Sequence, residues 1–367
     1  MIFGRQLNPL AAAIFYPRPP AGEGKSLPRT RSGGEGSSIA HTGTLRRIHI
    51  VTVIFTLLIV NPIFAHAQEP RRILYGISTS VSHLPVMVAK DAGLFTKNGL
   101  NIEPIQIRGG ALSTMAIMSG QSLLSGIGAE SVISARVEGA DVVLLACPSD
   151  LEPVSIVARP EIKSPADLRG KAGGITRLGS SIHFYLRAGL RMVGIDSDKE
   201  MTLLQLGSST EITSALENGQ IAVAALTVRN ALSFAPRNWP VLVDLTKTDL
   251  SYPSSCVTSS RAFVKTEPST VNAFLRAYVS AIQLIKKDHR FAERTLVKWL
   301  KDQDSIAVSK SVEAFARVFK PAPYVPDKGI ESVLKDLASR RPVPKEFIGR
   351  NDLFRDNGPL ERSLSRS

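Results

Sequence analysis

The chain has 367 residues, of which 43% are hydrophobic, and it contains only two cysteines. This length and apolar content are sufficient for two lobes with real cores, and the low aromatic content of 6% indicates cores built mainly from Ala, Val, Leu and Ile. The formal net charge is +13, but no run of Lys and Arg is interleaved with aromatic residues. Nucleic-acid binding is therefore not expected.

The N-terminal part has the three features of an export signal. The pair Arg46-Arg47 precedes an apolar stretch over 48–64, and Ala65-His66-Ala67 is a small-residue cleavage motif. We therefore expect a signal peptide over 45–67, cleavage after Ala67 and release into the periplasm. The alternative is an uncleaved membrane anchor, which the shortness of the apolar run disfavours.

Residues 1–44 precede this signal and are rich in Pro, Gly, Ser and Arg, without apolar periodicity. Such a composition is typical of a disordered segment. We expect residues 1–44 to be disordered, or to be an extension that is not translated because synthesis starts near Leu45.

After the signal, the stretch 72–105 predicts a strand, a helix and a second strand. The strand over 73–77 ends in the hydroxyl residues Ser78 and Thr79, and helical apolar spacing follows over 84–95. A second strand resumes over 100–107. Hydroxyl groups between a strand end and a helix start can receive an anion or an amide oxygen, or they can simply cap the helix.

Similar turns recur along the chain. Gly109-Gly110 precedes a predicted helix over 112–118, where the glycines allow either close approach to a ligand or a plain tight turn. Ser180-Ser181 precedes a predicted helix over 182–193, where the hydroxyls again either bind a ligand or cap the helix.

The rest of the chain alternates between strand-like apolar segments and segments with helical apolar spacing. Strands are expected at 125–128, 141–146, 151–158, 172–176, 201–206, 221–226, 241–245 and 255–263. Helices are expected at 131–138 and 208–216, and then consecutively at 271–287, 290–300, 305–318 and 330–338. Ser164 reads as a helix N-cap with Pro165 at the first helical position.

Three segments carry a resemblance to a known family. Residues 84–103 read LPVMVAKDAGLFTKNGLNIE, residues 164–171 read SPADLRGK, and residues 215–223 read ALENGQIAV. These segments resemble periplasmic solute-binding proteins of the nitrate/sulfonate/taurine ABC transporter type, in the thiamine-pyrimidine-precursor-like superfamily. In those proteins the second segment opens the second lobe.

The resemblance implies an α/β, two-lobed periplasmic-binding-protein (type 2) fold, with two lobes joined by two crossing strands and a ligand cleft between them. We expect lobe 1 at 68–156 and 258–356, lobe 2 at 157–257 and a disordered tail at 357–367. The helices after 265 should pack against lobe 1.

The same resemblance implies the function and the partners. The chain would be a monomer that captures a small-molecule ligand by lobe closure and delivers it to an ABC transporter permease in the inner membrane, without a cofactor or metal. The expected ligand-binding residues are Ser78, Thr79, His83, Leu84, Gly110, Ala111, Glu130, Gly179, Ser180, Ser181 and Thr227. Among these, Glu130 disfavours a bare dianion and favours an amine-bearing ligand such as a taurine-like zwitterion.

Catalytic chemistry is not indicated by the sequence. It contains no G-x-S-x-G, H-E-x-x-H or C-x-x-C motif. The superfamily includes pyrimidine-precursor synthases, but this chain lacks their cysteine-rich motif. Two other functions stay open, namely a solute receptor for a different transporter or sensor, and a synthase-like enzyme. Cys147 and Cys256 can pair in an oxidising periplasm, although two such cysteines are more often buried free thiols.

Overall fold

A computed structural model of the protein describes residues 71–301 and 303–365. These residues belong to one compact unit, Gln68–Ser367. The expected extension over 1–44 and the signal peptide over 45–67 lie outside the described residues.

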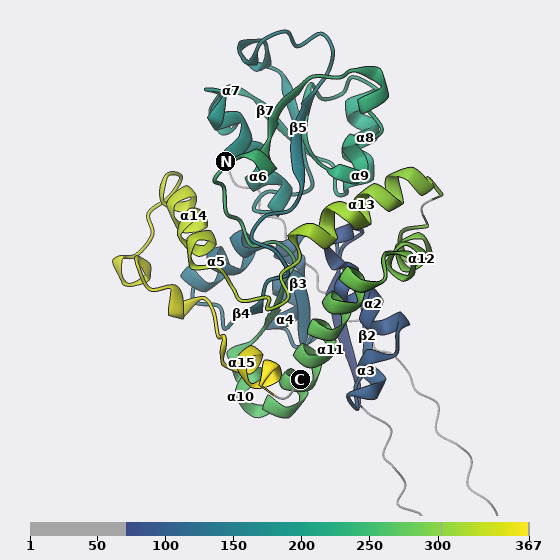
Figure 1. Ribbon diagram of the computed structural model, residues 1–367. Coiled ribbons are helices and arrows are strands. Elements are labelled where there is room, and N and C mark those ends of the chain that lie inside the picture. The colour runs from purple at the N-terminus through teal and green to yellow at the C-terminus, as the bar shows by residue number, and fades with distance from the viewer. Residues whose placement is uncertain (1–70, 302, 366–367) are drawn as a thin grey trace, which may run out of the picture. The chain divides into compact units, whose positions relative to one another are not determined.

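Two five-stranded mixed sheets form the framework (Figure 1). The first sheet has the order β2-β1-β3-β10-β4, with strands β1 (Arg72–Ile77), β2 (Asn101–Gln106), β3 (Leu124–Ile127), β4 (Val143–Ala146) and β10 (Cys256–Ser259). The second has the order β7-β6-β8-β5-β9, with strands β5 (Val154–Ala158), β6 (Ala172–Ile175), β7 (Thr202–Gln205), β8 (Val223–Thr227) and β9 (Val241–Asp244). The α/β class expected from the sequence is confirmed.

The two sheets follow the same plan. In the first, β1 lies parallel to β2 and β3, and β10 runs antiparallel to both β3 and β4. In the second, β6 lies parallel to β7 and β8, and β5 runs antiparallel to β8 and β9. The second sheet is built from five consecutive strands, β5 to β9, whereas the first sheet receives β10 after them. The chain therefore crosses between the sheets twice, first between β4 and β5 and then between β9 and β10. The division into lobe 1 and lobe 2 stays a prediction, because it concerns which residues move together.

Helices cover both sheets. Those that follow strands of the first sheet are α2 (Leu84–Asp91), α3 (Leu94–Lys97), α4 (Gly110–Met118), α5 (Ala129–Val137) and α10 (Arg261–Thr266). Those that follow strands of the second are α6 (Ser181–Met192), α7 (Ser197–Glu200), α8 (Ser209–Glu217) and α9 (Val228–Ala231). Short 3-10 helices are η1 (Val81–His83), η2 (Pro165–Leu168), η3 (Ala235–Arg237), η4 (Leu245–Lys247), η5 (Lys345–Phe347) and η6 (Asn351–Leu353).

The C-terminal helices contact both halves of the fold. They are α11 (Pro268–Lys287), α12 (His289–Leu300), α13 (Ser305–Val318), α14 (Asp327–Ala338) and α15 (Gly358–Leu364). Helices α11 and α12 pack against α2, as expected for elements of the first lobe. Helix α13 departs from this expectation because it also packs against α9, next to the second sheet.

Two further expectations about the C-terminal half are wrong. The strand expected over 255–263 ends at Ser259, because the Ser260 hydroxyl accepts a hydrogen bond from the backbone N–H of Phe263 and starts α10. Within the tail expected to be disordered over 357–367, residues Gly358–Leu364 form α15. Pro359 lies in the first turn of this helix, and Leu360 is buried against the core that contains α11.

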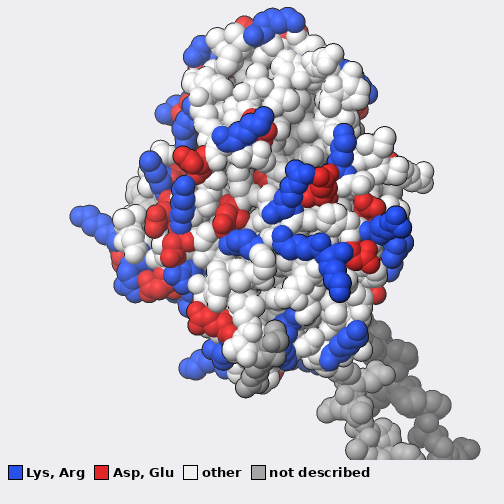
Figure 2. Space-filling view, in the orientation of Figure 1, with Lys and Arg blue, Asp and Glu red and all other residues white. Residues whose placement is uncertain are grey.

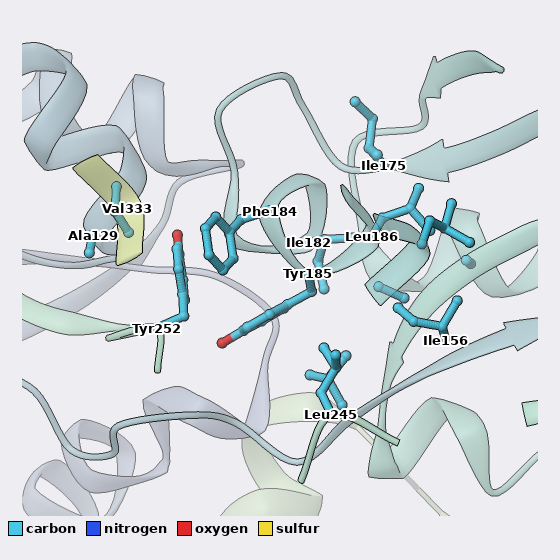
Figure 3. Packing of buried hydrophobic residues seen from close by; sticks show 14 of the residues in the cluster. Ala129, Ile156, Ile175, Ile182, Phe184, Tyr185, Leu186, Leu245, Tyr252 and Val333 are labelled. Atoms are coloured by element: carbon cyan, nitrogen blue, oxygen red, sulfur yellow. The ribbon is translucent and has the colours of Figure 1, made fainter. Parts of the chain in front are cut away.

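The buried side chains form two clusters. In the first, Tyr75 and Phe95 each stack on Phe274 of α11, with ring centroids 5.2 Å apart in both pairs. The second is centred on α6, where Phe184 stacks on Tyr252 at 4.2 Å (Figure 3). Because Tyr252 lies in the second crossing, this apolar cluster extends from the second sheet into the segment that leads back to the first.

The surface is mixed in charge. On the face shown in Figure 2, Lys and Arg side chains are interspersed with Asp and Glu rather than gathered into one basic patch. Among the described residues, no helix is both long enough and apolar enough to cross a membrane.

A disulfide links Cys147, which follows β4, to Cys256, which opens β10. Our preference for two free thiols is therefore wrong. The pattern of the chain did not show that antiparallel pairing of β4 with β10 brings the ends of these strands together.

We predict that replacing both cysteines by Ser lowers the free energy of unfolding by about 2–4 kcal/mol, because the cross-link joins residues 109 positions apart and restricts the unfolded chain. Urea titration of the native and doubly substituted proteins measures the difference. Reducing agent should lower the stability of the native protein and leave that of the variant unchanged. Equal stability of the two proteins under oxidising conditions would contradict the prediction.

Candidate functional site

A cavity of about 770 Å³ lies where the carboxyl ends of parallel strands from both sheets meet. Ser78 follows β1 and Gln106 ends β2 on the side of the first sheet, while Thr176 follows β6 and Thr227 ends β8 on the side of the second. The two crossings add Glu152, Ser254 and Ser255. All parts of the framework thus contribute to one cavity of ordinary ligand-binding size.

Hydroxyl groups dominate the cavity wall and are joined to one another. Ser255 Oγ donates to Ser82 Oγ at 2.7 Å, and Ser82 Oγ lies 2.9 Å from Ser80 Oγ. Ser181 Oγ accepts from Tyr252 Oη at 3.2 Å and from Ser254 Oγ at 3.3 Å. Elements from both sheets and from the second crossing are therefore connected through hydroxyls that line the cavity.

The two interpretations of the hydroxyl turns are compatible. Ser80 caps η1, and Ser180 caps α6 by accepting from the backbone N–H of His183 at 3.3 Å. Both residues also line the cavity. Capping fixes the start of each helix at the cavity wall, where its remaining backbone N–H groups favour a negatively polarised group.

His83 is a buried member of the wall. Its Nε2 lies 3.0 Å from Ser78 Oγ. Burial lowers the pKa of His83 to about 4, so the ring is neutral at neutral pH. It can therefore supply a hydrogen bond to a ligand without adding a charge to the cavity.

Glu152 is a buried carboxyl in the wall and was missed by the sequence analysis. It is 4% exposed, and burial raises its pKa, which the hydroxyls of Ser254, Ser82 and Ser255 only partly offset. In the sequence it follows Ser149-Asp150-Leu151, a pattern typical of an exposed turn. Only the crossing geometry places it at the cavity.

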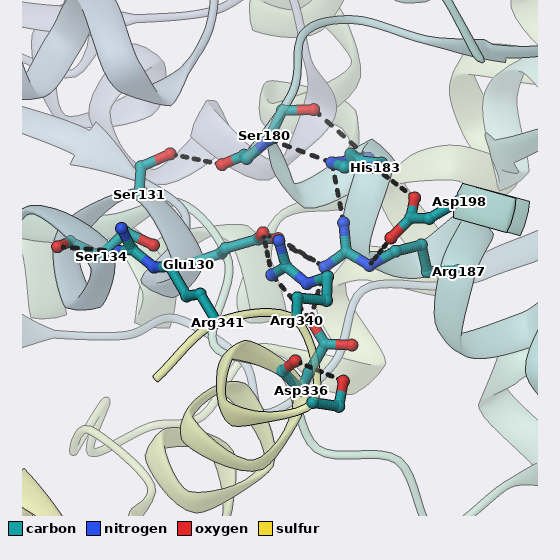
Figure 4. A network of polar contacts seen from close by, with 12 residues as sticks. Glu130, Ser131, Ser134, Ser180, His183, Arg187, Asp198, Asp336, Arg340 and Arg341 are labelled. Carbon is teal, nitrogen blue, oxygen red and sulfur yellow. Dashed lines mark hydrogen bonds and ion pairs between the residues drawn. The ribbon is translucent and has the colours of Figure 1, made fainter. Parts of the chain in front are cut away.

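Glu130 does not line the cavity, and our interpretation of it as a ligand carboxylate is wrong. It is buried in an ion-pair network with α6 and α14 (Figure 4). Arg187 Nη2 donates to both Glu130 carboxylate oxygens at 3.1 and 3.2 Å, and Arg340 Nη2 donates to Oε1 at 2.8 Å. The first turn of α5 directs this side chain towards α6 and α14.

The network continues through α14 and α7. Arg187 also donates to Asp336 Oδ2 at 2.5 Å. Burial alone would raise the pKa of Asp336, but Arg187 and Arg340 more than offset this effect, so the pKa lies below its usual value. His183 Nδ1 accepts from Arg187 Nη1 at 2.7 Å and from the Gly179 N–H at 3.0 Å, which leaves Nε2 as the donor to Asp198 Oδ1 at 3.3 Å.

The expected site residues therefore divide into two groups. Those that line the cavity are Ser78, Thr79, His83, Gly110, Ser180, Ser181 and Thr227. Three others lie elsewhere in addition to Glu130. Leu84 is buried in the first hydrophobic cluster, Ala111 is exposed on α4, and the Gly179 carbonyl accepts from Ser131 Oγ at 2.7 Å and so joins the starts of α5 and α6. A ligand contact by the lining residues stays a prediction.

Further lining residues escaped the sequence analysis. Besides Glu152 they include Ser82, Gln106, Ser131, Gln205, Ser209, Ser254 and Ser255. Gln106 and Gln205 end β2 and β7, so their positions at strand ends could have been used to find them. The serines of the second crossing carried no comparable signal.

Gly128 allows the halves of the cavity to approach closely. A Cβ added at Gly128 would lie 2.1 Å from Ser181 Oγ and 2.7 Å from Tyr252 Oη. Residue 128 precedes α5, and Ser181 begins α6. A side chain at position 128 would therefore push apart the two helix starts that flank the cavity.

Metal binding finds no support in the part of the chain that is described, where no group of three or more His, Cys, Asp or Glu residues is arranged to hold an ion. The cavity wall offers hydroxyls, amides, helix starts and a buried carboxyl. These groups recognise a polar solute by hydrogen bonds.

The family follows from a comparison with family models, because the model described as NMT1/THI5 like matches residues 80–290, more than half of the chain. The chain belongs to the NMT1/THI5-like family. A search of curated protein sequences finds no match to this member of the family.

Solved structures similar to this NMT1/THI5-like chain include binding proteins and an enzyme. The alkanesulfonate-binding protein SsuA from Xanthomonas axonopodis pv. citri, bound to MOPS, is 20% identical with a TM-score of 0.64, over 76% of this chain and 96% of that one. The periplasmic nitrate-binding protein NrtA from Synechocystis PCC 6803 is 12% identical with a TM-score of 0.66, over 81% and 89%. The desulfurization enzyme DszB, in complex with biphenyl-2-sulfinic acid, is 16% identical with a TM-score of 0.60, over 81% and 100%. These likenesses confirm the type 2 periplasmic-binding-protein fold.

We predict that His83 makes the protein less stable as the pH falls. Its folded-state pKa of about 4 lies below the ordinary value of 6.5, so between these values the unfolded chain binds a proton that the folded protein does not. The stabilisation is complete above pH 6.5 and is lost as the pH falls towards 4, by roughly 3 kcal/mol in total. Urea titrations of the native protein and His83→Gln at pH 7, 6, 5 and 4 should show their difference narrowing by that amount. A constant difference would refute the assignment.

We predict that Gly128→Ala destabilises the protein by about 1–3 kcal/mol, because its Cβ would overlap the Ser181 hydroxyl and the Tyr252 hydroxyl. The matched background is Ser181→Gly with Tyr252→Phe, which removes both overlapping oxygens. In that background the same Gly128→Ala substitution should cost markedly less, as measured in a double-mutant cycle by urea titration. Equal costs in the two backgrounds would show that close approach to these hydroxyls is not the reason for the glycine.

Proposed function

We propose that this protein is the periplasmic substrate-binding component of an ABC importer, and that it captures a small polar solute by closure of two lobes. The observation that carries the proposal is the composition of the cavity wall. Strand ends of both sheets and both crossings contribute to it, so a solute in the cavity would contact every part that must come together. Contacts that form only when both lobes enclose the ligand would then stabilise the closed state.

Two other observations support this function. The signal-like segment over 45–67 would bring the protein to the periplasm, where solutes arrive before transport. Similar folds include SsuA and NrtA, which are described as binding proteins for alkanesulfonate and nitrate. The partner would be a permease in the inner membrane that recognises the closed monomer.

A second candidate is an enzyme, favoured by one observation. DszB shares the fold and is described as a desulfurization enzyme. Two observations argue against an enzyme. Both cysteines of this chain form a disulfide, so neither is a free thiol that could act as a nucleophile. His83 is buried, neutral and hydrogen-bonded to Ser78. A receptor for a different transporter or for a sensor would have the same cavity and would differ in its membrane partner.

The test is a thermal-shift screen of the purified protein against sulfonates, taurine, nitrate, pyrimidines and aromatic carboxylates. A ligand that binds only the folded protein should raise Tm, with about 2.7 kcal/mol of added stability at a concentration of 100 times Kd. Chromatography of the mixture afterwards should recover the compound unchanged. Consumption of the compound would support the enzyme instead, and the absence of a shift with every compound would refute the binding function.

A further inference from the structure

Glu152 is an unusual residue for the wall of a cavity expected to take anions. It is 4% exposed, and its Oε1 has no hydrogen-bond partner. Among the described residues, no Lys, Arg or His pairs with its carboxyl. A buried polar atom without a partner costs free energy, and a buried carboxylate without a counter-ion costs more.

The surrounding hydroxyls are already engaged with one another. Each carries a single proton to donate. Ser255 donates to Ser82, and Ser254 donates to Ser181. The hydroxyls of Ser254, Ser82 and Ser255 also interact with the Glu152 carboxyl, but none of them is a hydrogen-bond partner of Oε1. The neighbouring His83 ring faces Ser78 through Nε2 and is neutral.

The other charged side chains of the cavity wall pair with each other. Arg108 and Glu211 also line the cavity, but their side chains are 68% and 47% exposed and they pair with each other at 3.8 Å. Among the described residues of the wall, no Lys or Arg is therefore buried and able to pair with the carboxyl of Glu152. A simple anion placed there would face the Glu152 carboxyl and no compensating cation.

We propose that Glu152 binds an amine or ammonium group of the ligand, so that the transported solute is an amine-bearing cation or zwitterion rather than a simple anion. This inference rests on the proposed binding function. The ligand amine supplies the donor that Oε1 lacks. The hydroxyls and backbone N–H groups at the start of α6, where Ser180 and Ser181 line the cavity, offer a separate place for a negatively polarised end.

The recognition of a ligand amine, which we expected of Glu130 from the sequence, is therefore assigned to Glu152. Both carboxyls are buried, but the structure provides Glu130 with two arginines and gives Oε1 of Glu152 no partner. A carboxyl that has its hydrogen-bond donors and counter-ions within the protein stabilises the fold. A carboxyl at a cavity that lacks these partners is available to recognise a ligand.

The test compares probes that differ by one amine. Isothermal titration of the purified protein at pH 7 uses taurine against ethanesulfonate, β-alanine against propionate, and benzylamine against benzyl alcohol. We expect the amine-bearing member of at least one pair to bind, and to bind about 100-fold more tightly than its amine-free partner.

Two variants locate the effect. Glu152→Gln should weaken binding of the amine-bearing probe about 100-fold, whereas Glu313→Gln, which removes an exposed carboxylate of α13 that does not line the cavity, should change it less than about threefold. Without ligand, Tm of Glu152→Gln should equal or exceed that of the native protein, because the substitution removes a buried carboxyl that has no counter-ion. A purely structural carboxyl would give a lower Tm instead, and that result would overturn the proposal.

The remaining outcomes distinguish a failure of the role of Glu152 from a failure of the binding function. If the amine-free members bind as tightly as their partners, and Glu152→Gln keeps that binding, the binding function stands and the role of Glu152 is refuted. If no probe binds while sulfonates or nitrate bind in the thermal-shift screen, the same conclusion follows. If nothing binds in either experiment, the binding function itself fails and the inference fails with it.

Discussion

The buried guanidinium of Arg187 determines how the two halves of the cavity face each other. Its side chain is 1% exposed and pairs with Glu130 at the start of α5 and with Asp336 of α14. Removing such a charge from water is expensive, so the pairing is favourable only when both carboxylates are in place. The geometry of α5, α6 and α14 is therefore mutually dependent. Residues beside Glu130 and at the start of α6 line the cavity, among them Gly128, Ser131, Ser180 and Ser181.

Neutral contacts extend this arrangement towards the crossings. Tyr252 stacks on Phe184 and donates its hydroxyl proton to Ser181, so a residue of the second crossing is held against α6 by an apolar face and a polar tip at once. Cys256, four residues later, is linked to Cys147 in the first crossing. The segments that join the sheets are thus tied to each other at one end and to the cavity wall at the other. Changes in the cavity and in the crossings should be coupled for this reason.

Much of the framework was predictable from local pattern. The apolar run of β4, the capping box of Ser164 with Asp167, and the hydroxyl turns before η1 and α6 all depend on residues close in sequence. The length of β10 and the helix α15 were both missed. The end of β10 depends on a local cap, because Ser260 stops a pattern that otherwise reads as strand. Helix α15 depends on a long-range contact, because Leu360 packs against a core that contains α11, some 80 residues earlier.

The two buried glutamates near the candidate site show most clearly what the local sequence cannot predict. Glu130 follows a strand end and a glycine, which is where a ligand residue is expected in this fold, yet two arginines from distant helices satisfy it. Glu152 lies in a turn-like stretch and carries no local signal, yet it reaches the cavity with Oε1 unpartnered. The residue type and burial of the two are alike, so neither property assigns their roles. What distinguishes a structural carboxylate from a recognising one is whether the rest of the chain supplies its counter-charge, and only the three-dimensional arrangement answers that question.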